Sequence, residues 1–173
     1  MKNKNKITLR QAGPQDVHAL LELKSEASNV YWSGHARAPD RKIFQAWFEK
    51  LPTSREVLLA ECDSKVVGYL YIDTVDEQRS KEVSIGVGEK FTGKSFGAMM
   101  LGTALSHVAP NGLHAWIFVD NSKSIRVFSK AGFERDDTVS PRLVSRHDKA
   151  DGVEQFLWRR LGRAQDSDDH CGR

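Results

Sequence analysis

Apolar residues recur with different periods along the chain, and each period predicts one kind of element. Residues 7–10 and 82–87 alternate between apolar and polar or small side chains, which predicts strands. Residues 57–61 and 66–73 are rich in β-branched and aromatic side chains and flank a polar turn. Because two such runs lie so close in sequence, they predict an antiparallel hairpin.

Three segments carry the spacing of amphipathic helices. The apolar residues that follow Asp16, Asp40 and Phe96 recur every three or four positions. Asp16 and Asp40 are predicted to be N-caps of their helices, because a carboxylate accepts from unpaired N–H groups there. Between these two helices, residues 28–39 are predicted to be a loop, with aromatic and basic side chains at Tyr31, Trp32, His35 and Arg37.

The second half of the chain alternates shorter elements. An apolar run at 113–119 predicts a buried strand, and the polar start of 121–130 predicts a short capped helix. Further strands are predicted from Phe133 onward and at 153–158. Residues 141–151 are polar and are predicted to be irregular.

Composition indicates one ordinary globular domain. The 173 residues are 39% hydrophobic and 28% charged, and the net charge of +3 gives no case for a nucleic-acid protein. No apolar run approaches the 18 residues of a membrane span, and the two cysteines have no metal-binding spacing. We therefore expect a cytoplasmic protein without metal, with a domain at 7–161, a flexible start at 1–6 and a disordered tail at 162–173.

A glycine-bearing loop joins the strand at 82–87 to the helix from Phe96. It contains Gly88 and Gly93, and Gly97 lies just inside the helix. Such a loop leaves backbone N–H groups unpaired at the positive end of the helix. The stretch therefore predicts an anion site, most often one for phosphate.

Two protein families have motifs that resemble this loop. GEKFTGKS matches the P-loop pattern G-x-x-x-x-G-K-[ST] of nucleoside triphosphatases at every position, and WIFVD resembles their magnesium-binding strand. The loop also resembles the V-x-P-x-x-(Q/R)-G-x-G-x-G pattern of the GNAT acetyltransferase superfamily. In that alignment Thr92 replaces the Gln/Arg and Ser95 replaces the middle glycine.

The rest of the chain favours the GNAT resemblance. A P-loop fold needs parallel strands joined by long crossovers, whereas here a predicted hairpin precedes the loop. NSKSIRVFSKAGF resembles the GNAT pattern N-x-x-S-I-x-x-(Y/F)-x-K-x-G-F, and ITLRQAGPQDVHALLEL is similar to the family's opening. The resemblance covers residues 7–160. It implies an α/β (α+β) single-domain GNAT fold, with a mixed, mostly antiparallel sheet of six to seven strands, helices on both faces and strands 4 and 5 splayed.

The resemblance implies acetyl-CoA as the co-substrate. Its pyrophosphate would bind backbone N–H groups of the loop, and its pantetheine arm would pair with the backbone near Val87 in the gap between the splayed strands. The cofactor-binding residues implied in this way are Val87, Thr92, Gly93, Lys94, Ser95, Phe96, Gly97, Asn121 and Ser124. A triphosphatase and a nonenzymatic CoA-binding module remain the alternatives.

The implied reaction is direct attack of a primary amine on the thioester. Glu82 is the first candidate for the base, with Ser84 and Tyr71 next and His35, Asp73 and His114 behind them. Phe128 stands where many members have a tyrosine acid. A general acid typically raises the rate by on the order of 10²- to 10⁴-fold. A phenylalanine at position 128 therefore affects the expected rate but not the type of reaction.

The acceptor is predicted from the aromatic segment between the first two helices. Aromatic faces stack planar groups and arginine pairs with phosphate or carboxylate, so Tyr31, Trp32, His35 and Arg37 are the predicted substrate-binding residues. HARAPDRKIFQAWFEKL also resembles amino-sugar N-acetyltransferases of the pseudaminic-acid type, which act on nucleotide-linked amino sugars. A protein N-terminus or a polyamine stays open as the acceptor, and a homodimer as the assembly. No nucleic acid or membrane partner is expected.

Overall fold

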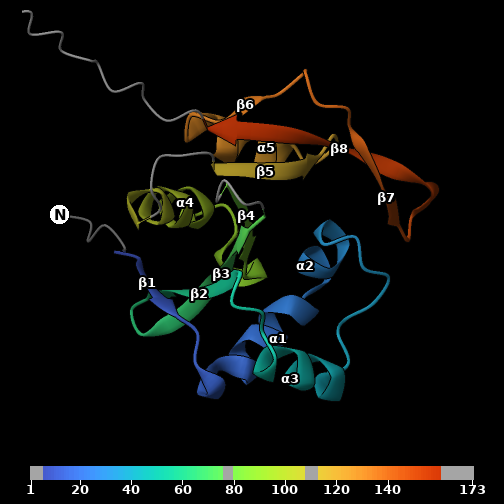
Figure 1. Cartoon of the computed structure of the whole chain (residues 1–173). Helices are drawn as coiled ribbons and strands as arrows, with labels where there is room; N and C mark the ends of the chain where they lie inside the picture. The colour runs from blue at the N-terminus through green and yellow to red at the C-terminus, as the bar shows by residue number, and fades with distance from the viewer. Residues whose placement is uncertain (1–5, 76–79, 108–112, 161–173) are drawn as a thin grey trace, which may run out of the picture.

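The computed structural model describes residues 6–75, 80–107 and 113–160 (Figure 1). The start predicted to be flexible lies outside the described residues except for Lys6, and the predicted tail lies outside them entirely. None of the helices in the described part of the chain has the length and apolar composition needed to cross a membrane.

The described strands form one eight-stranded sheet in the order β1-β2-β3-β4-β5-β8-β6, with β7 also paired to β8. Every pairing is antiparallel except that of β4 with β5. The strands are β1 Thr8–Gln11, β2 Arg55–Cys62, β3 Lys65–Thr74, β4 Lys81–Val87, β5 Leu113–Phe118, β6 Glu134–Arg135, β7 Arg142–Arg146 and β8 Lys149–Arg160. This topology confirms the mixed, mostly antiparallel sheet and is incompatible with the parallel sheet of a P-loop triphosphatase.

The described α-helices are α1 Val17–Ser25, α2 Ala27–Trp32, α3 Arg41–Glu49, α4 Phe96–His107 and α5 Ser122–Lys130. The Asp40 side chain accepts from the N–H groups of Lys42 and Ile43, which confirms it as the N-cap of α3. Asp16 does not cap α1 through its side chain, contrary to the prediction. Its carboxylate instead accepts from the Gly13 N–H and pairs with Arg10 at 2.7 Å.

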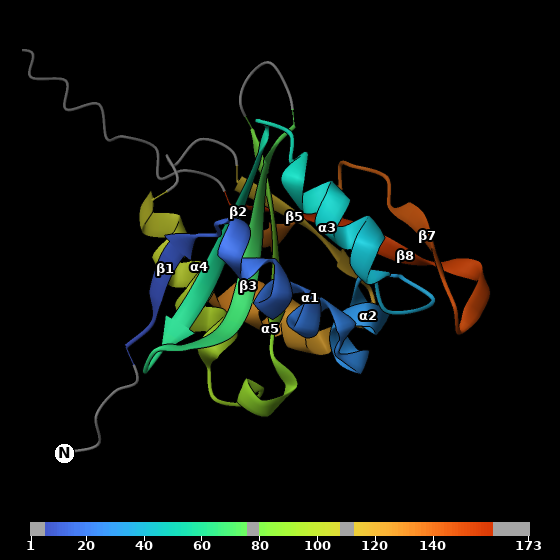
Figure 2. The same cartoon turned by 90° about the horizontal axis from the view of Figure 1, so that it is seen from below.

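Helices cover both faces of the sheet, as predicted, because alternate residues of the strands point to opposite sides. Leu70 and Ile72 of β3 pack in one core with α4, whereas Tyr69 and Tyr71 pack in a second core with α1 and α3. Figure 2 shows α4 on one side of β2 and β3 and the pair α1 and α3 on the other. The face toward α1 and α3 is called the acceptor face below.

Two segments differ from the sequence prediction. Residues 28–32, predicted to be part of a loop, belong to α2 (Ala27–Trp32), whose first-turn Ser28 N–H donates to the Glu89 carboxylate at 2.9 Å. The region predicted to be irregular forms β7 and the start of β8, which raises the strand number to eight. Both segments depend on side-chain contacts with distant residues, and such contacts leave no periodic pattern in the local sequence.

Candidate functional site

A cleft opens where β4 and β5 separate. The two strands pair only at Lys81 with Leu113 and at Glu82 with His114, and beyond these residues they part. A cavity of about 650 Å³ lies in the gap, lined by both strands, α2, the glycine loop, the start of α4 and one side of α5 along its length. Figure 1 shows the β1–β4 and β5–β8 halves of the sheet on either side of this opening. The predicted splay is therefore confirmed.

The register of β4 turns a row of peptide groups toward the cleft. The Gly88 N–H donates to the Val67 carbonyl of β3 at 2.9 Å. Because hydrogen-bonded and non-hydrogen-bonded pairs alternate in an antiparallel ladder, Val83, Ile85 and Val87 direct their N–H and C=O groups away from β3. All three line the cleft. An extended chain with amide groups can therefore pair with this edge as an added strand would.

The glycine loop ends in two left-handed residues directly before α4. Gly93 has φ +77° and Ser95 has φ +64°. Only glycine adopts such angles without strain, which explains why the GNAT pattern has glycine where this chain has Ser95. Thr92, Gly93, Ser95, Phe96 and Gly97 all line the cleft, so the open N–H groups of the α4 N-terminus face it.

Lys94 is placed differently from the other predicted loop residues. It does not appear among the residues that line the cleft, and its Nζ lies 5.8 Å from the centre of the Phe91 ring. The loop therefore offers its backbone rather than this ammonium group to a ligand.

The start of α5 forms the opposite wall. The Asn121 Oδ1 accepts from the Ser124 N–H at 3.1 Å, as expected for an N-cap, and both residues line the cleft. No described group accepts from the Asn121 Nδ2, which leaves this amide as a donor for a ligand. Phe128 also lines the cleft and packs its ring 5.0 Å from that of Phe133.

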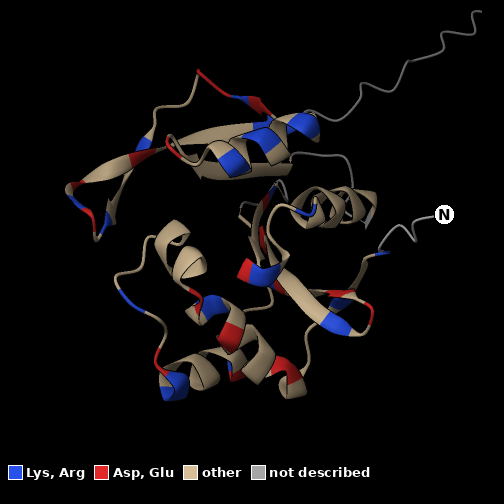
Figure 3. Ribbon diagram, turned by 180° about the vertical axis from the view of Figure 1, so that it is seen from behind, with Lys and Arg blue, Asp and Glu red and all other residues tan. Residues whose placement is uncertain are grey.

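The sequence analysis did not predict Lys123 and Arg126 of α5 as cofactor-binding residues, and it favoured a solvated position for Lys130. Lys123, Arg126 and Lys130 line the cleft, and Figure 3 shows the basic positions gathered on this helix. Their spacing of three and four residues places them on one face of α5, so a search for basic helical stripes would have found them. They give the phosphate end of the cleft a positive potential.

A second group that the sequence analysis missed joins α2 to the cofactor loop. The buried Asn29 donates from Nδ2 to the Val87 carbonyl at 3.3 Å and to the Leu23 carbonyl at 2.9 Å. The Glu26 carboxylate accepts from the Glu89 N–H at 2.8 Å. Together with the bond from Ser28 to Glu89, these contacts fix α2 against the end of β4. No local pattern in residues 26–29 indicates this role.

Glu82 is not among the residues that line the cleft. It directly precedes Val83, which does, at the point where β4 and β5 still pair. Its Oε2 is 3.9 Å from the His114 Nε2, and its Oε1 is 4.0 Å from a terminal nitrogen of Arg142. The Glu82 side chain is 27% exposed, so it is reachable from solvent. Arg142 in turn donates to the Gln155 Oε1 at 2.7 Å and lies over the ring of Trp116.

The two other predicted catalytic residues differ in their surroundings. Ser84 is exposed and lines the cleft, next to Glu82 on the acceptor face. Tyr71, its partner on β3, is only 8% exposed, and burial raises the pKa of its phenol. A phenol with a raised pKa does not accept a proton from an amine at neutral pH, so Tyr71 can act there only as a hydrogen-bond donor. Asp73 is held by Arg55 at 2.6 Å.

The predicted substrate-binding residues do not form one group. Trp32 lines the cleft, whereas Tyr31 donates to Asp148 at 3.1 Å and lies under the guanidinium of Arg146. His35 is exposed on the acceptor face, and burial and the charge of Lys24 lower its pKa. Arg37 is exposed and has no described partner.

Arg146 is the centre of a charged cluster that packs behind Trp32 and Phe118, two residues of the cleft wall. Its side chain is fully buried, and it pairs with Asp120 and with Asp148, each at 2.7 Å. The guanidinium also lies 5.5 Å from the ring of Trp32 and 5.2 Å from that of Phe118. The cluster therefore joins the β7–β8 hairpin to α2 and to the end of β5.

These features fit acetyl-CoA. An arm with amide groups matches the open peptide groups of β4, and a pyrophosphate matches the N–H groups at the start of α4. The basic face of α5 suits the remaining phosphate charge. Among the residues that the structure describes, no group accepts from the Asn121 Nδ2, as expected of a donor that binds a ligand.

Comparison with known proteins agrees with this geometry. The sequence profile described as the acetyltransferase (GNAT) family matches residues 17–133. A Bacillus subtilis protein provisionally named a phosphinothricin acetyltransferase is 28% identical over 137 residues, which are 73% of this chain and 83% of that protein. An uncharacterized N-acetyltransferase of Methanocaldococcus jannaschii is 23% identical over 80% of this chain, which spans 66% of the length of that relative.

Solved structures show the same fold. The structure of yncA from Salmonella typhimurium with acetyl-CoA superposes with a TM-score of 0.74 and is 21% identical, over 96% of this chain and all of that one. The spermidine N-acetyltransferase of Vibrio cholerae, solved with CoA and spermine, gives a TM-score of 0.77 at 14% identity, over 90% and 95% of the two chains. Given the profile match and the splayed strands, the chain belongs to the GNAT family of acetyltransferases, with acetyl-CoA as its co-substrate.

Proposed function

We propose that this protein is an N-acetyltransferase that transfers the acetyl group of acetyl-CoA to the primary amine of a small molecule. The observation that carries the proposal is the separation of β4 from β5 after Glu82, beside the open N-terminus of α4. Acetyl-CoA supplies the acetyl group as a reactive thioester. Glu82 directly precedes the first β4 residue that lines this cleft, so an amine that enters beside Ser84 can reach its carboxylate.

The chain's own groups bind and orient the co-substrate. The N–H groups of 92–97 hold the pyrophosphate, the peptide groups of Ile85 and Val87 pair with the arm, and the Asn121 Nδ2 donates to it. The Val87 N–H faces the cleft, where it can stabilise charge that develops on the carbonyl oxygen. Holding both reactants in one cleft accounts for much of the rate.

Proton transfer depends on Glu82. Its carboxylate takes the proton that leaves the attacking amine, directly or through a water held with Ser84. His114 and Arg142 lie 3.9 and 4.0 Å from its oxygens, which is longer than a hydrogen bond. Phe128 has no proton to donate, so the thiol leaves as thiolate or is protonated by water; with an ordinary thiol pKa of about 8.5 this is feasible.

The proposed acceptor is a class of molecule, small compounds with a primary amine. Trp32 lines the cleft, where its aromatic face is available to stack on a planar group of the acceptor. A nucleotide-linked amino sugar remains one such acceptor, although the relatives named above carry other substrates in their names. The two named substrates, phosphinothricin and spermidine, both present a primary amine, which the proposal requires.

The test combines binding with turnover. Acetyl-CoA at one hundred times its Kd should stabilise the protein by about 2.7 kcal/mol and raise Tm by roughly 5–10 °C, whereas Mg-ATP should not raise it. Incubation with acetyl-CoA and a panel of amines should release free thiol, with the acetylated amine identified by mass spectrometry. Stabilisation by CoA without any acetylated amine would identify a nonenzymatic CoA-binding module instead.

A further inference from the structure

Lys24 is a half-buried cation on the acceptor face that the proposed reaction leaves without a role. It lies in the last turn of α1, and its Nζ is 5.2 Å from the ring centre of Tyr69 and 5.4 Å from that of Tyr71. The ammonium group donates to the Ser33 Oγ at 3.2 Å. Lys24 follows Leu20 by four residues, so it shares the helix face that packs on the sheet.

The charge of Lys24 is not compensated. Within the described ranges, no carboxylate lies within ion-pair distance of its Nζ, whereas the neighbouring Arg55 is held by both oxygens of Asp73. Burial and the charge of Arg55 lower the pKa of Lys24 to about 8. Lys24 is therefore mostly protonated at neutral pH. The two aromatic rings and the one hydroxyl around it do not neutralise its positive charge.

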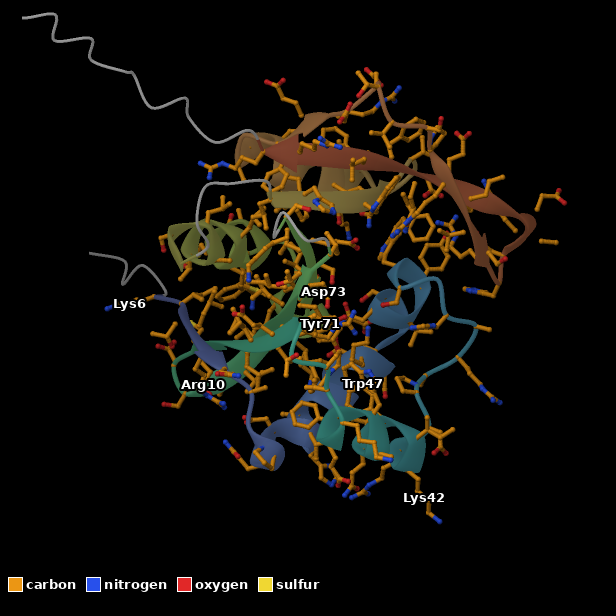
Figure 4. All side chains as sticks on the ribbon, in the orientation of Figure 1. Lys6, Arg10, Lys42, Trp47, Tyr71 and Asp73 are labelled. Atoms are coloured by element: carbon orange, nitrogen blue, oxygen red, sulfur yellow. The ribbon has the colours of Figure 1, made fainter. Side chains whose placement is uncertain are left out.

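A hydrogen-bond donor without a partner lies beside this cation. The Tyr71 hydroxyl is buried and has no hydrogen-bond partner in the described part of the chain. Buried polar groups almost always have a partner, so an unpaired one calls for an explanation. Figure 4 shows Tyr71 in the interior of the molecule, between Trp47 of α3 and Asp73 on its own strand. A bound oxygen acceptor would satisfy this hydroxyl.

Lys24 and Tyr71 do not line the cleft themselves, but they lie beside β3 residues whose strand partners do. Tyr69 and Tyr71 are the direct cross-strand partners of Gly86 and Ser84, and both of these β4 residues line the cleft. The next pair along the two strands is Asp73 with Glu82. The cation and the hydroxyl therefore lie one strand away from the place where the proposed base meets the amine.

We propose that Lys24 and the Tyr71 hydroxyl form an oxyanion subsite, and that the amine acceptor carries a carboxylate or phosphoryl group which binds there. The subsite rests on the proposed acetyl transfer and specifies its substrate class. A polyamine would instead place further positive charge beside Lys24 and Arg55. Like charges repel across such short distances in a partly buried site, so the acceptor is an anionic amine.

The test compares amines that differ only in the anion. Suitable pairs are ethanolamine phosphate with ethanolamine and an amino acid with its carboxamide, and spermidine serves as the polycation. We expect kcat/KM to be at least tenfold higher for the anionic member of each pair. The carboxamide has more free amine at neutral pH than the amino acid, so the comparison works against the expected result. Equal values, or a preference for spermidine, would overturn the proposal.

Two variants assign the preference to Lys24. Lys24→Gln should reduce the anionic-to-neutral ratio of kcat/KM to below threefold, and Lys24→Arg should restore most of it. Lys42→Gln removes the same charge from the outer side of α3, where Lys42 points into solvent (Figure 4), and should leave the ratio unchanged. A ratio that survives in Lys24→Gln would show that the preference arises elsewhere and would contradict the assignment.

A binding experiment tests the oxyanion subsite independently of the proposed acetyl transfer. Calorimetric titration of ethanolamine phosphate into the CoA-saturated protein should give a Kd that Lys24→Gln weakens at least fivefold. This result would support the subsite even if no amine were acetylated, which would count against the proposed reaction alone. Failure of ethanolamine phosphate to bind more tightly than ethanolamine would overturn the subsite, whether or not acetyl transfer occurs.

Discussion

Replacement of Glu82 by glutamine should lower kcat by about 10²- to 10³-fold, because the variant cannot take the proton from the attacking amine. The KM for acetyl-CoA should change little, since the groups that hold the co-substrate lie from Ile85 onward and on α5. Steady-state kinetics with a saturating amine acceptor would measure both constants. The rate that remains should rise with pH as more of the amine becomes unprotonated.

Glu154→Gln is the matched control for this experiment. Glu154 is exposed on β8 and forms no ion pair within the described residues, so its replacement should leave kcat within twofold of wild type. If kcat of Glu82→Gln also stayed within threefold, Glu82 would not be the base. A normal unfolding transition in both variants would show that the loss of activity is not a loss of folding.

Replacement of Arg146 by methionine should lower the free energy of unfolding by about 2–3 kcal/mol. Removing one member of a buried ion pair costs about 3–5 kcal/mol when the remaining charge stays buried. Asp120 and Asp148 are about one third exposed, so solvent reduces this cost. Chemical denaturation would measure the change, and Tm should fall by roughly 5–10 °C.

Arg135→Met provides the comparison. Arg135 also pairs with a carboxylate, Asp137, but both side chains are well exposed, so the expected change is below about 1 kcal/mol. Equal losses in the two variants would contradict the view that Arg146 holds the β7–β8 hairpin to α2.

The Arg146 cluster makes the free energy of unfolding depend on pH in the acid range. Arg146 lowers the pKa of Asp120 below its ordinary value and that of Asp148 to about 2. A carboxylate with a lowered pKa in the folded state stabilises that state above its unfolded pKa, near 3.8, and loses this contribution as pH falls toward 2. The Arg146→Met variant should therefore lose less stability than wild type over this acid range.

The sequence predicted the elements that are encoded by local periodicity. The strands at 57–61, 66–73 and 82–87, the Asp40 cap and the loop before Phe96 all depend on neighbouring residues, and the structure contains each of them. The splay of β4 from β5 came instead from the resemblance to the GNAT family, because no local pattern reports that two strands part.

The parts that could not be predicted depend on contacts between distant residues. Residues 27–32 form a helix because Glu89, 61 positions from Ser28, binds the first turn. The polar β7 is held by the buried pairing of Arg146 with Asp120, 26 residues away. The unpaired charge of Lys24 is likewise visible only in three dimensions, since its sequence neighbours are those of any amphipathic helix.

Amide hydrogen exchange of the β4 edge tests the central claim most directly. The claim is that the arm of acetyl-CoA pairs with peptide groups that the splay of β4 and β5 leaves open. Saturation with CoA should slow exchange at the amides of Ile85 and Val87 at least tenfold, together with the amides of 95–97. Unchanged exchange at Ile85 and Val87 in a protein saturated with CoA would show that the ligand binds elsewhere and would contradict the account.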